Sequence, residues 1–162
     1  MRLALSAALA GAVLFGTASI AHAEPKPMSD RHDVRRSRSV AIEAVRGDKG
    51  SSASRAAFGE ALARQLGRLG FNVVEGGRTV TYRMQPTVLT LDTAGGGAGA
   101  NVEVKASVVA LDRKGRVAAM VEGGARTQNT PGVAPAHLES QAVEAAARSI
   151  AEDLARRLLE AH

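Results

Sequence analysis

The sequence predicts an α+β domain, a single antiparallel or mixed sheet of about five strands with two helices packed on one face, in the order β-α-β-β-β-β-α. Two patterns lead to this fold class. Residues 79–127 contain long segments in which apolar and polar residues alternate, which is the period of a strand with one buried face. Residues 52–70 and 137–159 each carry apolar side chains three or four positions apart, which is the period of a helix with one buried face.

Residues 1–23 have the composition of a cleaved secretory signal peptide. Arg2 gives a positive start, residues 3–20 are almost wholly apolar, and Ala21-His22-Ala23 is a small-x-small cleavage signal. The alternative is an uncleaved membrane anchor, because an apolar run of about 18 residues is near the lower limit for spanning a bilayer. The cleavage signal and the glycines within the run favour cleavage between Ala23 and Glu24, with no transmembrane anchor afterwards. We therefore expect a periplasmic or secreted protein.

The chain contains no cysteine. This excludes a disulfide framework, a cysteine-based metal site and a lipid-modified cysteine at the cleavage junction. Residues 39–160 are long enough to form one domain whose core needs no disulfide.

The formal net charge is +5, and its distribution is uneven. We predict that residues 24–38 form a disordered basic arm, because they combine prolines, serines and charges with few apolar residues. The arm has two readings, a solvated linker or an electrostatic tether to an anionic envelope surface. Outside the cytoplasm such a tether would meet anionic lipid, glycan or acidic protein, and we expect no nucleic-acid partner. The candidate contact residues are Arg31, Arg35, Arg36 and Arg38.

The first half of the domain is predicted as strand, helix, strand. Residues 40–45 alternate, with Val40, Ile42 and Ala44 expected to face inward. A helix follows, capped by Ser51 or Ser52 and ended by Gly70, which leads directly into a short strand at residues 71–75. The apolar stripe of this helix is Phe58, Leu62, Leu66 and Leu69.

The third predicted strand, residues 79–93, changes phase in its middle. Val80, Tyr82 and Met84 share one face, whereas Leu89 and Leu91 fall out of step with them. Proline lacks an amide hydrogen, so Pro86 predicts a sheet edge or a bulge that returns both leucines to the inner face.

The last two strands and the closing helix have clearer patterns. Residues 102–111 place Val102, Val104, Ala106, Val108 and Ala110 inward, and residues 112–115 form a turn. The strand at residues 116–127 should bury Val117, Ala119 and Val121, and Gly123-Gly124 marks a second candidate edge. The helix at residues 137–159 has the stripe Val143, Ala146, Ile150, Leu154 and Leu158.

No residue pattern predicts a catalytic, cofactor-binding or metal site. His32, His137 and His162 lie far apart, without the spacing of zinc ligands. The glycine-rich residues 94–100 lack the Lys and Ser or Thr of a phosphate-binding loop and precede a strand instead of a helix. No serine stands in a G-x-S-x-G elbow.

The order of these segments resembles the amino-terminal domain of TolB and related bacterial envelope proteins. The likeness covers roughly residues 39–159, from Val40-Ala41-Ile42 through Phe71-Asn72-Val73-Val74 to the closing helix. The chain is similar also to the curli secretion lipoprotein and the penicillin-binding-protein activator lipoproteins. Unlike these it has no anchor cysteine, and unlike TolB no propeller follows the domain. The resemblance implies a non-enzymatic domain that works through protein contacts, often by an edge strand or helix faces.

From the sequence we therefore expect a non-enzymatic accessory protein that binds an envelope protein partner. The alternative is a binder of lipid or glycan in a groove between the helices and the sheet. An enzyme of unidentified type is the third hypothesis.

Overall fold

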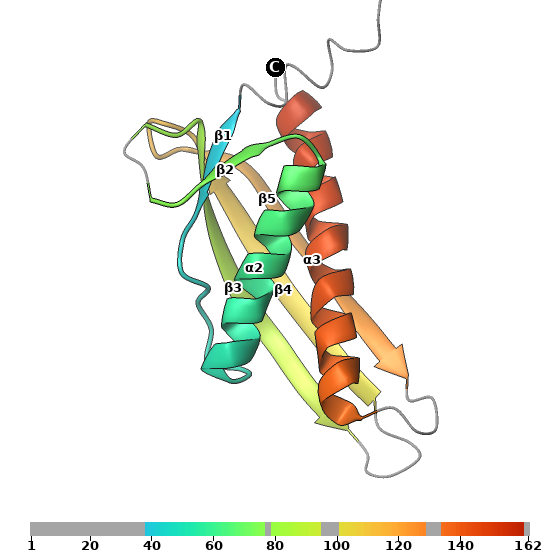
Figure 1. The fold of residues 1–162 in the computed structure, drawn as a ribbon. Coiled ribbons are helices and arrows are strands. Elements are labelled where there is room, and N and C mark those ends of the chain that lie inside the picture. Colours follow the sequence, from blue (N-terminus) through green and yellow to red (C-terminus); the bar gives the residue numbers. More distant parts are fainter. Residues whose placement is uncertain (1–37, 77–78, 95–100, 129–133, 161–162) are drawn as a thin grey trace, which may run out of the picture.

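The computed structural model describes residues 38–76, 79–94, 101–128 and 134–160 (Figure 1). The predicted signal peptide, most of the predicted basic arm and the glycine-rich residues 95–100 lie outside the described residues. The elements in chain order are β1 (Ser39–Ile42), α2 (Ser52–Arg68), β2 (Asn72–Val74), β3 (Tyr82–Ala94), β4 (Asn101–Leu111), β5 (Val117–Gln128) and α3 (Pro135–Glu160).

The strands form one mixed sheet in the order β2-β1-β3-β4-β5. The central pairs β3–β4 and β4–β5 are antiparallel, whereas β1 pairs in parallel with both β2 and β3. Figure 1 shows α2 and α3 side by side on the same face of this sheet. The predicted fold class and element order are confirmed.

Local signals set the ends of α2. At its start the Ser51 hydroxyl accepts a hydrogen bond from the Ser54 backbone N–H at 3.0 Å, which satisfies one of the amides that a helix leaves unpaired. At its end Gly70 adopts a φ of 89°, a conformation that favours glycine, and the Phe71 N–H donates to the Leu66 carbonyl. This cap turns the chain directly into β2, as predicted.

The core lies between the helices and the inner face of the sheet. All five predicted inward residues of β4, from Val102 to Ala110, are fully buried. The predicted apolar stripe of α3 is also buried, together with a further set of alanines. Because these side chains are small, α3 packs close to the sheet: a Cβ built on Gly123 would lie 2.9 Å from Cγ1 of Ile150.

The bulge in β3 lies three residues beyond the predicted position. Pro86 is buried and pairs with Val108, and the register shifts between Val88 and Thr90 instead. The inserted residue is Leu89, which is 40% exposed, so its prediction as an inward side chain was wrong. Leu91 does return to the inner face, where it packs on the core.

Pro86 marks the place where β1 ends, and β3 is not an edge strand there. The Glu43 N–H donates to the Met84 carbonyl at 2.9 Å, and the next rung of a parallel ladder would need a donor at position 86, which proline lacks. The chain therefore leaves the sheet and rejoins it only at Arg46, whose N–H donates to the Pro86 carbonyl. Ala44, predicted inward, is exposed because β1 has already ended.

Strand β5 begins with a register shift that the sequence did not reveal. Leu111 pairs with Val117 and Ala110 with Ala119, which leaves Ala118 as an extra residue. The phase changes there, so Val117 is 64% exposed and its inward prediction was wrong, whereas Ala119 and Val121 are buried as predicted. Since β5 is last in the sheet order, the edge predicted at Gly123-Gly124 is confirmed.

Replacing Gly47 with alanine should lower the free energy of unfolding by about 2 kcal/mol, because a left-handed backbone and a steric clash both oppose a side chain. Gly47 has a φ of 126°, and a Cβ there would lie 2.3 Å from the Val88 carbonyl oxygen. Urea unfolding measures the effect. Gly67→Ala is the matched control, since Gly67 lies in α2 with open space around its Cβ position. That change should stabilise by roughly 0.5–1 kcal/mol, and equal effects of the two changes would contradict the account.

Candidate functional site

The outward face of β3, β4 and β5 is the candidate site. Both described helices lie on the other face, so the outward side chains of these three long strands are covered by no described helix (Figure 1). The face mixes apolar and charged groups: Met120 is 56% exposed, and its pairing partner Val109 is half-buried beside it. We call this surface the open sheet face and define it by Thr87, Lys105, Val109, Met120, Glu122 and Arg126 with the ion-paired Glu103.

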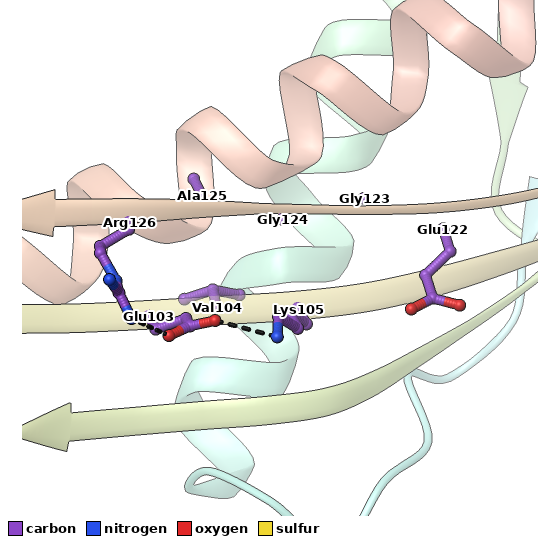
Figure 2. Close-up of a pocket in the computed structure, with 8 residues that line it drawn as sticks. All are labelled: Glu103, Val104, Lys105, Glu122, Gly123, Gly124, Ala125 and Arg126. Carbon is purple, nitrogen blue, oxygen red and sulfur yellow. Dashed lines mark hydrogen bonds and ion pairs between the residues drawn. The ribbon is translucent and has the colours of Figure 1, made fainter.

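A fixed ionic group lies near one end of the open sheet face, where Glu103 pairs with Arg126. The Glu103 carboxylate forms ion pairs with Arg126, at 2.7 Å, and with Lys105, at 3.0 Å (Figure 2). The hydrogen bond from Arg126 is the main cause that holds the pKa of the Glu103 carboxyl below its ordinary value of 4.5, and Lys105 adds to it. Glu103 is therefore an ionised acceptor and is poorly suited to act as a general base near neutral pH.

Beside this group the surface is hollowed to a volume of about 470 Å³ (Figure 2). Gly123 and Gly124 line the hollow with bare backbone, and Glu122 stands at its far end. Gly124 is required by the packing, because a Cβ there would lie 2.5 Å from the Val104 carbonyl oxygen. Glu122 forms no ion pair with any residue that the structure describes, so its carboxylate is available to a partner.

The other charged contacts on described residues join parts of this chain to one another. Glu144 of α3 accepts from Arg64 at 2.8 Å and from Gln65 at 2.6 Å, both on α2. The Arg64 hydrogen bond is the main reason that the pKa of Glu144 lies below its ordinary value. Near the starts of the two helices the Ser54 hydroxyl donates to Glu139 at 2.5 Å. These bonds fix α2 against α3, and we assign them a structural role.

Only one of the residues predicted from the sequence as a site lies in the described structure. Ala23, Glu24, Arg31, Arg35 and Arg36 lie outside the described residues, and their roles stay predictions.

Arg38 is half-buried at the start of the domain. Its guanidinium donates to the Leu158 carbonyl in the last turn of α3, where a cation is favoured by the helix dipole. Its own carbonyl accepts from the Asn72 N–H at 3.2 Å. Arg38 is therefore tied into the fold on two sides, and any tether would depend on the three arginines before it.

Within the described ranges no group of three or more His, Asp or Glu side chains is arranged to hold a metal ion. Among the same residues no helix has both the length and the apolar character that a membrane span requires.

The chain matches no protein-family model and no curated protein, but it matches the folds of several solved structures. The PelC dodecamer from Paraburkholderia phytofirmans has a TM-score of 0.56 at 12% identity, over 71% of this chain and 89% of that one. Lipoprotein GNA1162 from Neisseria meningitidis gives 0.50 at 14%, over 71% and 99%. Protein CT253 from Chlamydia trachomatis gives 0.62 at 11%, over 76% and 99%.

These TM-scores show a shared fold, and at 11–14% identity the likeness extends no further. The domain therefore shares its fold with a solved bacterial lipoprotein, GNA1162, and with PelC, in agreement with the fold that the sequence resemblance implied.

Arg126→Gln should raise the pKa of Glu103, because it removes the principal hydrogen bond to the carboxylate. With Arg126 present, the carboxyl stays ionised as the pH falls through the range where unfolded glutamates protonate. Its stabilising contribution is therefore present above the unfolded pKa and is lost as the pH falls through the folded pKa. A pH titration of the Glu103 side-chain carbon by NMR measures this. Arg113→Gln, in the β4–β5 turn, is the control and should leave the midpoint unchanged; an unchanged midpoint in Arg126→Gln would contradict the assignment.

Proposed function

We propose that this protein is a non-enzymatic accessory protein of the bacterial envelope that acts through protein–protein contacts. Residues 1–23 would direct its export, which places its action in the periplasm or outside the cell. The fold shared with envelope lipoproteins supports this setting, and the resemblance to the TolB amino-terminal domain agrees with it. The observation that carries the proposal is the open sheet face.

The chemistry of the open sheet face suits a protein partner. Protein interfaces are enriched in Met and Arg and combine an apolar centre with a polar rim. Here Met120 and Val109 form an apolar patch on the same face as the paired charges of Glu103 and Arg126. Charges held by neighbouring side chains lose little freedom when a partner binds, so this face is preorganised for recognition. The PelC structures are dodecamers, which supports assembly as a mode of action for domains of this fold.

A lipid or glycan between the helices and the sheet is less well supported. Phe58 and Leu62 of α2, and Ile150 and Leu154 of α3, are fully buried. In the described part of the chain these side chains fill the layer in which the alternative places a ligand. The basic arm keeps its two readings, because its first arginines lie outside the described residues.

Photo-crosslinking in intact cells tests the proposal. A photoreactive amino acid at Met120 should yield a discrete crosslinked protein band, because this side chain is exposed in the apolar patch of the open sheet face. The matched control carries the same amino acid at Arg148, on the exposed side of α3, and should yield no such band. Mass spectrometry would identify the partner.

Equal crosslinking at the two positions, or none at Met120, would contradict the proposal. Lipid extracted from the purified protein in stoichiometric amount would instead support the ligand alternative.

A further inference from the structure

Strand β5 is a long sheet edge whose register with β4 shifts at its start, at Ala118, and is regular beyond that residue. It spans 12 residues and ends the sheet, with no described strand beside it on its outer side. Natural edge strands are commonly protected by proline, lysine or a bulge. From Ala119 to Gln128, β5 has no proline and no lysine, and its register with β4 is unbroken.

The hydrogen-bond pattern shows which backbone groups of β5 are unpaired. The Val88 N–H donates to the Arg46 carbonyl at 2.9 Å, so Val88 and the residues in phase with it direct their backbone groups toward the β1 side. In an antiparallel ladder such groups alternate, so Gln85 and Thr87 face β4, and Val108 of β4 faces β5.

Val108 of β4 is paired with Val121, so the backbone N–H and C=O groups of Val121 face β4. The residues on either side of it, and those in phase with them, therefore direct their N–H and C=O groups away from the sheet. They are Met120, Glu122, Gly124 and Arg126.

The two charged residues of this set are placed symmetrically about Gly124. Glu122 lies two residues before it and Arg126 two residues after it. If two β5 strands pair antiparallel with Gly124 opposite Gly124, each Glu122 lies opposite Arg126 of the second copy. Centring the pair on Glu122 or on Arg126 instead would place like charges opposite each other, which is unfavourable. Of these three registers, the one centred on Gly124 alone places opposite charges across from each other.

The surroundings of the edge leave room for a second strand. Gly124 has no side chain at the two-fold axis, and Glu122 forms no ion pair with any described residue. Between β5 and α3 the surface has a hollow of about 280 Å³, lined by Val121 and Glu122 of β5 and by residues of α3 that include Ser149. Arg126 lies between Glu103 of its own chain, at 2.7 Å, and the position of the incoming Glu122.

We propose that β5 pairs antiparallel with β5 of a second copy of this chain, centred on Gly124, to join two sheets into one. This rests on the proposed function and deepens it, because it names one partner as the protein itself. The two copies would be related by a two-fold axis, with both open sheet faces on the same side of the joined sheet.

Charge reversal tests the register. Sedimentation of the purified protein should show a monomer–dimer equilibrium. Glu122→Arg and Arg126→Glu should each raise the dimer dissociation constant at least about tenfold, because each places like charges opposite at two positions. A mixture of the two variants should form heterodimers, since both arginines of the first variant would face the two glutamates of the second. A monomeric wild-type protein at all concentrations, or a mixture that stays monomeric, would overturn the proposal.

Arg126→Glu also removes the partner of Glu103, so the folding of this variant is checked by circular dichroism. Engineered cysteines provide a second readout that does not depend on it. The chain has no cysteine of its own, so a disulfide in a variant can form only between the introduced residues. In the proposed register Met120 lies opposite Gln128 of the second copy, at a Cα separation of roughly 5.5 Å, which a disulfide can span. Met120→Cys with Gln128→Cys should therefore form a covalent dimer on mild oxidation, and either cysteine alone should not.

The two proposals fail in different ways. Absence of the disulfide-linked dimer, with Met120 still crosslinked to another protein, would overturn self-pairing and leave the proposed function standing. A dimer without any other crosslinked partner would support self-pairing and count against a separate envelope partner.

Discussion

The close packing of α3 on β4 and β5 is the constraint on which the rest of this structure depends. All five inward residues of β4 are fully buried, and a side chain at Gly123 would collide with Ile150. A helix this near to a sheet needs small residues on both surfaces, which the alanines of α3 and Gly123 provide. Since α2 packs beside α3 through Glu144 and Glu139, both helices cover the same face, and the opposite face of the long strands is left to solvent or a partner.

The elements with an unbroken period could be predicted from the sequence, and those with a bulge could not. The alternation of β4 and the stripes of both helices located the core correctly, because each follows from one local repeat. Leu89, Val117 and Ala44 were misplaced for a common reason. Each lies where the register shifts or a strand ends, and that depends on hydrogen bonds to residues distant in the chain. Pro86 signalled an irregularity, but the strand that it interrupts is β1 and not β3. Since Pro86 has no N–H to donate to β1, β1 ends there while β3 continues.

The candidate site was only partly visible in the sequence. Gly123-Gly124 indicated the edge, whereas the ionic group of Glu103, Lys105 and Arg126 depends on the register between β4 and β5. The signal that could have found it is the outward phase of both strands, which places these charges on one face. Composition predicted a contact role for the arginines of the basic arm, yet Arg38, its one described residue, joins the start of the domain to the end of α3.

Helices cover one face of the sheet and leave the other open, and β5, the strand proposed to pair with a second copy, ends the sheet. Amide hydrogen exchange along β5 tests this most directly. In dilute solution the amides of Val121, Gly123 and Ala125 should be protected, and those of Met120, Glu122, Gly124 and Arg126 should exchange quickly. Protection of the second set should appear as the protein concentration rises. Fast exchange of that set at every concentration, or equal protection of both sets in dilute solution, would contradict the account.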